Sequence, residues 1–420
     1  MFLLLKGKNK NGRQGLIQTK SGGVKTPVFM PIATRGAIKN LTPEEVKNLG
    51  AEIILGNTYH LWLRPGLSVI KKFGGLHKFI NWSGPILTDS GGYQIFSLDN
   101  KVKSQNAGNK NLRKNVKPND KFCAGLVKIT DEGAEFKDPL NGKKYFMSPE
   151  DSIQIQLDLG ADIIMVLDHC PAYPVSQKQA KEAVKRTTEW AIRCKDYFDK
   201  KIQFVSLSSK RTASQSALFS NQTSEKVSRP LLFGIVQGSI YQELRRHSAK
   251  ELLKIGFDGY AIGGVAVGEP RKYLWEILKW VLPLLPKNKP RYLMGLGRPE
   301  EIVGAARAGI DMFDCVIPTR EARHGRIYKF KNQKAKIKIT GQDAKFYEII
   351  QITNAKLASD FNPIDKNCSC YTCQNYSRAY LNHLFKIKEP LAMRLATTHN
   401  LKFYLELMEK LREQKDNKEE

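Results

Sequence analysis

The chain has 420 residues, 41% of them hydrophobic, and a formal net charge of +27. This length suits one large barrel with an added subdomain, or two to three ordinary domains, and the hydrophobic fraction excludes global disorder. The excess of 68 Lys and Arg over 41 Asp and Glu favours a nucleic acid or another anionic surface as partner. A lysine-rich proteome produces the same excess, so charge alone does not choose the partner.

The sequence contains no segment typical of membrane insertion or secretion. No apolar run approaches the roughly 18–20 residues that span a bilayer, and the start MFLLLKGKNK lacks a cleavage-like segment. We therefore expect a cytoplasmic protein without a membrane partner, whose seven cysteines are reduced.

Short apolar runs dominate the chain after a polar lead-in, residues 1–27, which we expect to be antiparallel. Strand-then-helix repetition indicates a parallel sheet with crossover helices, and eight such units predict an α/β fold of the (β/α)8 TIM-type barrel class. A doubly wound open sheet is the alternative, but no strand-turn-helix GxGxxG supports it. The eight runs are Val28–Ile32, Glu52–Leu55, Pro85–Leu87, Asp162–Leu167, Leu231–Val236, Gly259–Ile262, Arg291–Met294 and Ile310–Val316.

Helical patterning follows many of these runs. The first helix begins Thr42-Pro-Glu-Glu, with an N-cap residue, a proline and two acids in the first turn. The tail Lys402–Glu420 predicts a helix with a frayed, charged end. The other expected helices are Pro149–Leu159, Ser176–Phe198, Ile240–Ile255, Tyr273–Leu282 and Pro299–Ala308, while the first covers Thr42–Leu49.

Two segments interrupt the barrel pattern. Lys101–Lys121 carries seven Lys and Arg and one Asp, and Ser206–Arg229 is rich in Ser, Gln and Asn. Both compositions are typical of surface insertions. We therefore expect a lead-in at 1–27, a barrel formed by 28–319 and 400–420 with insertions near 101–121 and 206–229, and a zinc-binding subdomain inserted at 320–399.

Polar side chains and glycines follow the predicted strands. Because the carboxyl ends of barrel strands meet at one mouth, where barrel active sites lie, this pattern predicts a functional site. A single Asp after a strand is a common turn residue. Polar residues or glycines after several strands indicate a shared site more strongly. The residues are Asp89, Ser90, Asp168, Gln237, Gly263, Gly264, Gly295, Gly297 and Asp314.

The stretch Gly309–Arg326, GIDMFDCVIPTREARHGR, concentrates the chemistry. Its apolar first half predicts a buried strand with Asp314 near its end. Its second half predicts a loop, broken by Pro318 and Gly325, that carries four basic residues. Arginines suit phosphate binding, so a carboxylate beside them suits chemistry on a polyanion. The alternative is that Asp314 caps a turn and the arginines are solvated.

Three cysteines lie within six residues, at Cys368, Cys370 and Cys373. In a reducing compartment this spacing indicates zinc, with one ligand missing from tetrahedral closure. His383 and His399 are both candidates for that ligand, and spacing does not choose between them. Four protein ligands would make the site structural rather than catalytic.

Several long motifs together resemble the queuine tRNA-ribosyltransferases, or tRNA-guanine transglycosylases, in their bacterial form. The likeness runs from about Gly12 to Leu411 apart from the two insertions. The motifs are Thr88-Asp-Ser-Gly-Gly-Tyr-Gln-Ile-Phe-Ser97, Gly256-Phe-Asp-Gly-Tyr-Ala-Ile-Gly-Gly264, Val267-Gly-Glu-Pro270, Gly309-Ile-Asp-Met-Phe-Asp-Cys315, Pro318-Thr-Arg320, Cys368-x-Cys-x-x-Cys373 and Thr398-His-Asn400.

The resemblance implies a TIM barrel with a zinc-binding insertion and exchange of guanine at the first anticodon position of tRNA for a 7-deazaguanine. Asp314 would be the nucleophile on the ribose in a retaining double displacement, and Asp89 the general acid/base. Arg320 and Arg323 would bind anticodon-loop phosphates. His399 would complete a structural Zn²⁺ site, one per subunit of a homodimer.

The resemblance also implies a base pocket. Asp168 would accept from guanine N1–H and its amino group, and the Gln237 amide and Gly264 N–H would donate to O6. Tyr93 and Met294 would stack on the flipped base, and the Val265 carbonyl would meet the aminomethyl group of the incoming base. Ser90 is placed in the same pocket.

Cys170 and Val267 match the bacterial pattern, for which the incoming base is 7-aminomethyl-7-deazaguanine. His169 departs from it, because bacterial relatives usually carry a carboxylate there. Three other readings stay open: a non-catalytic RNA-binding subunit, a hydrolase that leaves abasic tRNA, and the archaeal branch. The presence of both Asp89 and Asp314 argues against the first, and a chain that ends soon after His399 argues against the third.

Overall fold

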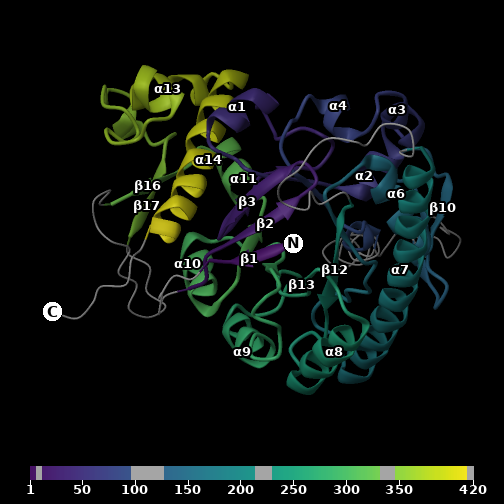
Figure 1. The fold of residues 1–420 in the computed structure, drawn as a ribbon. Helices are drawn as coiled ribbons and strands as arrows, with labels where there is room; N and C mark the ends of the chain where they lie inside the picture. Colours follow the sequence, from purple (N-terminus) through teal and green to yellow (C-terminus); the bar gives the residue numbers. More distant parts are fainter. Residues whose placement is uncertain (6–11, 96–126, 213–228, 332–345, 414–420) are drawn as a thin grey trace, which may run out of the picture. The chain divides into compact units, whose positions relative to one another are not determined.

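The computed structural model describes residues 1–5, 12–95, 127–212, 229–331 and 346–413 (Figure 1). Each of the eight predicted apolar runs contains a strand. They are β4 (Val28–Met30) with β5 (Ile32–Ala33), β6 (Ile54–Gly56), β7 (Ile86–Thr88), β11 (Ile163–Met165), β12 (Leu231–Val236), β13 (Gly259–Ile262), β14 (Arg291–Leu293) and β15 (Met312–Asp314).

The strand order identifies a barrel. It is β4-β15-β14-β13-β12-β11-β7-β6-β5, and only Pro31 separates β4 from β5 in the chain. Proline has no N–H to donate, so Pro31 divides one barrel strand into β4 and β5. These two halves stand at the two ends of the strand order, which therefore closes on itself. The pairings of β11 with β12, β12 with β13 and β15 with β4 are parallel. The predicted (β/α)8 fold is confirmed.

The barrel strands are buried along their length, as parallel strands covered on both faces must be. All six residues of β12 are buried, and so are all residues of β11, β13, β14 and β15. This explains why the strands appear in the sequence as continuous apolar runs rather than as alternating patterns.

The predicted helices are present. Their bounds are α1 (Pro43–Asn48), α6 (Pro149–Leu159), α7 (Gln177–Thr212), α8 (Gln242–Ile255), α9 (Lys272–Val281) and α10 (Pro299–Ala308). Thr42 is the N-cap of α1, as predicted, and it forms a capping box with Glu45: the Glu45 N–H donates to Thr42 Oγ1 at 3.2 Å, and the Thr42 N–H donates to Glu45 Oε2 at 2.8 Å.

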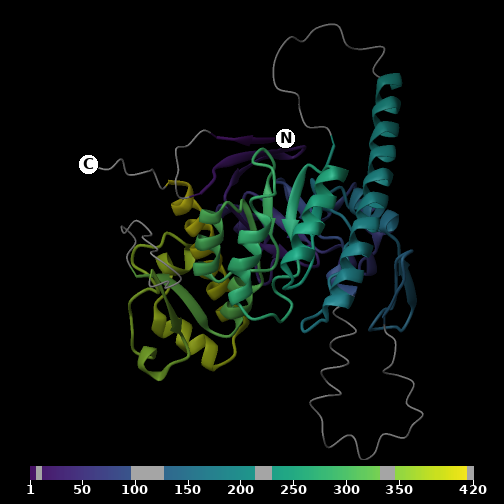
Figure 2. The same ribbon diagram turned by 90° about the horizontal axis from the view of Figure 1, so that it is seen from below.

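Two helix boundaries differ from the prediction by more than two residues. α7, the long teal helix in Figure 2, continues to Thr212, so 206–212 are helical rather than the start of an insertion. The rest of that predicted insertion up to 228, and all of 101–121, lie outside the described residues. The C-terminal helix α14 (Pro390–Glu413) begins well before Lys402.

The stretch after β15 was predicted wrongly as a loop. Residues Ile317–Arg323 form the helix α11, with Pro318 in its first turn. Proline is tolerated there because the first N–H groups of a helix have no partner within it. The strand ends at Asp314, and Val316 lies beyond it with an exposed side chain.

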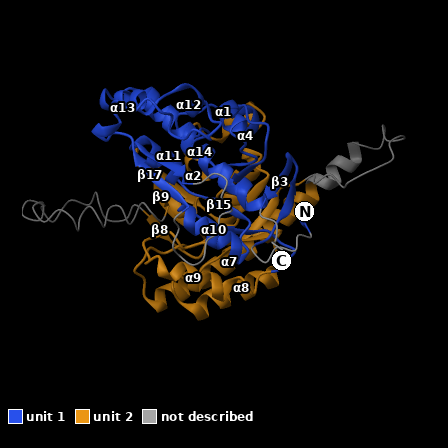
Figure 3. Cartoon of the chain, turned by 90° about the vertical axis from the view of Figure 1, so that its left-hand side faces the viewer, with its two compact units in different colours: residues 1–56, 76–87, 286–420 blue, residues 57–75, 88–285 orange. Residues whose placement is uncertain are grey.

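The chain divides into two compact units (Figure 3). Unit 1 comprises residues 1–56, 76–87 and 286–420, and unit 2 comprises 57–75 and 88–285. Besides barrel elements, unit 1 holds the antiparallel strands β1 (Phe2–Leu4), β2 (Gly15–Thr19) and β3 (Gly22–Thr26), α4 (Leu76–Ile80), the hairpin β16 (Arg326–Phe330) and β17 (Tyr347–Gln351), η2 (Ala355–Leu357), α12 (Tyr371–Asn375) and α13 (Arg378–Lys386). Unit 2 adds α2 (Thr58–Leu63), α3 (Leu67–Lys72) and the antiparallel strands β8 (Val127–Ile129), β9 (Ala134–Lys137) and β10 (Lys144–Met147).

In unit 1, α14 packs against α11, α12, α13 and β16, so it joins the segment that follows the last barrel strand. Among the described residues, none of the helices has the length and apolar character needed to cross a bilayer.

Candidate functional site

The carboxylate of Asp314, at the end of β15, is buried and anchored through one oxygen. Oδ1 accepts from Tyr292 Oη at 2.6 Å and from the Gly295 N–H at 2.8 Å. Burial raises the pKa of Asp314, while these two hydrogen bonds oppose the rise by stabilising the anion. Oδ2 accepts no hydrogen bond from the described part of the chain, which leaves it available for another contact.

The loop after β14 fits closely against the residue that follows Asp314. A Cβ on Gly297 would lie 2.1 Å from Cys315 Sγ. The Gly297 carbonyl accepts from Tyr404 Oη at 2.8 Å, which connects this loop to α14. Glycine at this position therefore lets strand β15, the β14 loop and α14 meet.

The two predicted phosphate-binding arginines both lie on α11 in unit 1. The Arg320 side chain is half exposed, with Nε 3.5 Å from Glu321 Oε1, and Arg323 donates to the Thr319 carbonyl at 3.0 Å. Glu321 also pairs with Arg326 at 2.5 Å. The arginines are therefore held on a helix next to Asp314 in sequence, with Arg320 open to solvent.

A second group in unit 1 has the composition of a metal centre. The side chains of Cys368, Cys370, Cys373 and His399 are buried, and their ligand atoms all lie within 4.8 Å of one another. His399 Nδ1 is 3.7, 3.6 and 3.2 Å from the three sulfurs. Ligands in a tetrahedral Cys₃His zinc site are about 3.6 Å apart, so the group fits a metal ion. His383 is not part of it.

The histidine tautomer also suits a metal. His399 Nε2 is 2.7 Å from the Tyr328 carbonyl oxygen, which can only accept, so Nε2 carries the proton. The Nδ1 lone pair then faces the three sulfurs. Hydrogen bonds from Cys368 and Cys373 lower the pKa of Cys370, which favours a thiolate in this group.

Asn400 connects the metal centre to α11. Its Oδ1 accepts from the Tyr328 N–H at 3.0 Å, and its Nδ2 donates to the carbonyls of Pro318 at 3.2 Å and Arg326 at 2.9 Å. Pro318 lies in the first turn of α11, the helix that carries Arg320. The residue next to a metal ligand thus holds the start of the arginine-bearing helix.

In unit 2, Asp89 is held at the start of α2. Its Oδ2 accepts from Asn57 Nδ2 at 2.6 Å and its Oδ1 from the Thr58 N–H at 2.9 Å. Thr58 Oγ1 donates to the Asp89 carbonyl as well. Both oxygens of the Asp89 carboxyl group are therefore fixed in place at the start of α2.

Asp168, Gln237 and Ser90 meet in a buried cluster of unit 2. Gln237 Nε2 donates to Asp168 Oδ2 at 2.7 Å, and Ser90 Oγ donates to Asp168 Oδ1 at 3.4 Å. Burial raises the pKa of Asp168 to about 6, against the lowering effect of these two hydrogen bonds. The cluster therefore combines a carboxylate acceptor with an amide donor.

The two glycines after β13 border this cluster. A Cβ on Gly263 would lie 2.7 Å from Gln237 Nε2, and one on Gly264 would lie 2.5 Å from Gln237 Oε1. Gly264 also has a φ of +61°, which disfavours other residues. Val265 follows and is buried. Glycine is therefore required here by space and, at Gly264, by conformation.

The two residues predicted to stack on a base belong to different units. Tyr93 in unit 2 is 49% exposed, so part of its side chain is accessible to a ligand. Burial of its other part, together with Cys170 and Glu269, raises its pKa, so it remains a neutral phenol. Met294 in unit 1 is half-buried directly after β14.

His169 contacts α7. Its Nδ1 is 3.1 Å from Arg186 Nη1, which can only donate, so Nδ1 accepts. Burial and the Arg186 charge lower the pKa of His169 to about 4, so the ring is neutral above that pH. Arg186 Nε in turn pairs with Asp131 at 3.0 Å.

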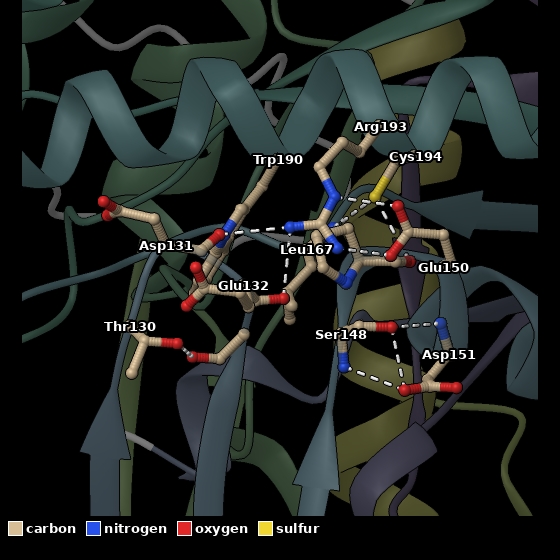
Figure 4. Close-up of polar contacts among 12 residues, drawn as sticks. Thr130, Asp131, Glu132, Ser148, Glu150, Asp151, Leu167, Trp190, Arg193 and Cys194 are labelled. Carbon is tan, nitrogen blue, oxygen red and sulfur yellow. Dashed lines mark hydrogen bonds and ion pairs between the residues drawn. The ribbon is translucent and has the colours of Figure 1, made fainter.

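The turn between β8 and β9 is fixed by other side chains of α7 (Figure 4). Trp190 Nε1 donates to the Asp131 carbonyl at 2.7 Å, and Arg193 Nη1 donates to the carbonyls of Asp131 and Glu132, both at 3.1 Å. Arg193 also makes a two-pronged pair with Glu150 at 2.8 and 2.7 Å. α7 therefore connects His169 to the antiparallel sheet of unit 2.

Sequence reasoning missed the residues that hold these groups, above all Arg245, Tyr292 and Asn57. Arg245 is fully buried and donates to the Gly263 and Gly264 carbonyls. One signal was available: a charged residue lies on the apolar face of α8, in line with Ser248, Ala249 and Leu252. Tyr292 and Asn57 act through hydrogen bonds to Asp314 and Asp89, which are distant in the sequence, so no local sequence pattern indicates these contacts.

Comparison with known proteins places the whole chain in one family. Residues 8–418 match the family model described as queuine tRNA-ribosyltransferase. A queuine tRNA-ribosyltransferase of Vibrio atlanticus is 45% identical over 412 residues, covering 98% of this chain and 92% of the relative. Those of Vibrio parahaemolyticus and Vibrio cholerae are 46% and 45% identical over 408 residues, covering 97% of this chain and 91% and 90% of the relatives.

With the barrel, the Cys₃His group and a match over nearly its full length, the chain belongs to the queuine tRNA-ribosyltransferase family, which consists of glycosyltransferases of the tRNA-guanine transglycosylase class.

Proposed function

We propose that this protein exchanges guanine at the wobble position of tRNA for 7-aminomethyl-7-deazaguanine, through a covalent enzyme–tRNA intermediate, in queuosine biosynthesis. The observation that supports it most is the carboxylate of Asp314, in which one oxygen is anchored by Tyr292 and Gly295 and the other accepts no hydrogen bond from the described residues. A carboxylate fixed in this way has one oxygen free to attack an electrophilic carbon.

The exchange proceeds in two displacements. Asp314 Oδ2 attacks the ribose C1′ as the C1′–N9 bond breaks, and guanine leaves with the bonding electron pair on N9, which takes a proton from Asp89. The incoming base then gives its N9 proton to Asp89, and N9 attacks C1′ and releases the Asp314 carboxylate. Two inversions retain the configuration at C1′, and the phosphodiester backbone is not cut.

Base recognition falls to the cluster around Asp168. Its carboxylate accepts from N1–H and the amino group, and the Gln237 amide and the Gly264 N–H donate to O6. Tyr93 and Met294 stack on the base, with Ser90 beside it, and the Val265 carbonyl accepts from the aminomethyl group. The exposure of Tyr93 and the raised pKa of Asp168 are in line with these roles.

The tRNA anticodon loop binds through phosphate contacts of Arg320 and Arg323 on α11. Cys368, Cys370, Cys373 and His399 would hold one structural Zn²⁺ per subunit, in a subdomain at 320–399. We further propose a cytoplasmic homodimer. In favour of a second copy, Tyr371 and Tyr380 are exposed, Tyr376 stacks on Tyr380 with ring centroids 5.3 Å apart, and these rings form an aromatic surface.

The test is uptake of labelled guanine into unmodified tRNA by the zinc-loaded protein. Uptake with the tRNA chain left intact supports base exchange. Release of guanine with an abasic site in the tRNA would instead support a hydrolase, in which water takes the ribose. Tight tRNA binding without either reaction would support the non-catalytic subunit.

Guanine affinity is expected to fall as pH drops through about 6. Burial raises the pKa of Asp168 to about 6, and the protonated carboxyl no longer accepts from N1–H as an anion. The affinity for guanine should therefore reach its maximum well above pH 6 and be about tenfold below that maximum at pH 5. The dissociation constant of guanine from tRNA-free enzyme between pH 5 and 8 measures it, and a flat profile would contradict the assignment.

His169→Gln is the matched control for this profile. The pKa of His169 lies at about 4, so its titration falls outside the same range, and the variant is expected to keep the midpoint.

His169→Glu is expected to alter base tolerance while leaving guanine exchange intact. The introduced carboxylate would pair with Arg186, whose Nη1 already contacts His169 Nδ1 at 3.1 Å, and would add negative charge beside Asp168. We expect the ratio of kcat/KM for the aminomethyl base to that for guanine to change by about threefold or more. Unchanged kinetics for both bases from pH 5 to 8 would remove this role.

A further inference from the structure

Arg245 is a fully buried cation that forms no ion pair with the described residues. It extends from the first turns of α8, and among the described residues no carboxylate lies within ion-pair distance of its guanidinium. Burial lowers the pKa of Arg245 to about 10, and the charge of Glu269, beyond ion-pair distance, partly opposes this effect, so Arg245 stays protonated at neutral pH. A buried cation near the start of a helix is unfavourable without an ion pair, because desolvation and the helix dipole both oppose it.

The guanidinium is satisfied entirely by backbone carbonyls. Nε donates to Ser239 O at 2.7 Å, and Nη1 donates to Val236 O at 3.1 Å and Gly263 O at 2.6 Å. Nη2 donates to Gly264 O at 2.7 Å. One side chain thus holds the ends of two neighbouring barrel strands, β12 and β13, and the turns that follow them.

The carbonyl contacts fix the directions of the peptide N–H groups. The Gly263–Gly264 bond is trans, because the cis peptides of the described chain all precede proline. In a planar trans peptide the C=O and the N–H point in opposite directions. With Gly263 O turned toward Arg245, the Gly264 N–H points away from it. The same argument turns the Gln237 N–H away from Val236 O, and it donates to Ser248 Oγ at 3.1 Å.

We propose that Arg245 is a positioning residue for base recognition, which aims the Gly264 N–H at the base and holds the backbone of Gln237 in place. The inference rests on the proposed function, since it takes Gly264 and Gln237 to face O6 of guanine. This role explains why a charged side chain is buried here. The N–H groups of a guanidinium can orient several carbonyls at once, which an apolar side chain cannot do.

Arg245→Met tests this in the full-length, zinc-loaded enzyme. We expect KM for guanine to rise about tenfold to a hundredfold, with kcat at saturating base and the Kd for tRNA within about threefold of the parent. Selectivity is the more specific readout. 6-Thioguanine keeps N1–H but has a poorer acceptor at position 6, so the preference for guanine over 6-thioguanine should shrink by about tenfold.

Arg246→Met is the matched control, because it removes the same charge from the next residue of α8, on the exposed face. It should change neither KM nor the preference. Arg245→Lys keeps the cation but has fewer donors, so it should give an intermediate loss and remains informative where the methionine variant does not fold. Melting curves show which variants are folded.

The outcomes separate the two proposals. A parent enzyme without guanine exchange would remove the proposed function. A parent that exchanges guanine, together with a folded Arg245→Met or Arg245→Lys variant that keeps both the guanine KM and the preference over 6-thioguanine, would overturn the role of Arg245 alone.

Discussion

Asp314→Asn is expected to reduce guanine exchange by about 10⁴-fold or more, with little change in stability or tRNA affinity. The introduced amide oxygen can still accept from Tyr292 and Gly295, which contact Oδ1 at 2.6 and 2.8 Å. The amide nitrogen then occupies the position of Oδ2, and because its lone pair is delocalised into the carbonyl, it is too weak a nucleophile to attack C1′. Single-turnover uptake of labelled guanine at saturating tRNA measures the loss.

Tyr292→Phe is the graded control for this prediction. It removes one of the two hydrogen bonds that oppose the effect of burial on the Asp314 pKa, so the pKa should rise further. We expect an intermediate loss of about 10-fold to 100-fold that grows at lower pH. An Asp314→Asn enzyme that keeps a tenth of the parent rate would show that another group attacks the ribose.

Removal of the metal is expected to lower the melting temperature by about 10 °C or more, because metal binding at a structural site contributes several kcal/mol to folding. The four ligands join α12 to α14, and α14 also packs against α11 and β16. The tRNA affinity should fall as well, because Asn400, next to His399, holds the Pro318 carbonyl at the start of α11. Melting curves and tRNA binding with and without a chelator measure both effects.

Two cysteine variants separate metal loss from loss of a buried thiol. Cys370→Ser removes a ligand and should abolish binding of about one zinc per chain by elemental analysis. Cys194→Ser changes an equally buried thiol that accepts from the Leu167 N–H at 3.4 Å, far from the ligands in sequence, and should keep the metal. Equal zinc content in both variants would contradict the assignment of the metal centre.

Much of the fold was predictable because parallel barrel strands are buried on both faces. Leu231–Val236 is a continuous apolar run in the sequence and a fully buried strand in the structure. The cysteine spacing similarly predicted a metal centre, but the choice of His399 over His383 needed the resemblance. The structure explains the choice by tertiary packing: the Tyr328 carbonyl binds Nε2 and leaves Nδ1 facing the sulfurs.

The parts that sequence reasoning missed depend on contacts that no local pattern records. Pro318 and Gly325 suggested a loop, yet proline is tolerated in a first helical turn, and α11 forms. Tyr292 lies inside an apolar run, and the hydrogen bond of its hydroxyl to Asp314, 22 residues later, appears only in the structure. Arg245 was detectable only as a charge on the apolar face of α8, and its four carbonyl partners required the structure.

The most direct test of the account is to identify the residue that becomes attached to tRNA. The enzyme would be mixed with unmodified tRNA, quenched by denaturation before the incoming base is added, and digested for mass spectrometry. The account predicts a ribose adduct on the peptide that contains Asp314, lost in Asp314→Asn and released when 7-aminomethyl-7-deazaguanine is supplied before the quench. An adduct on Asp89 instead, or base exchange at full rate without any adduct, would contradict it.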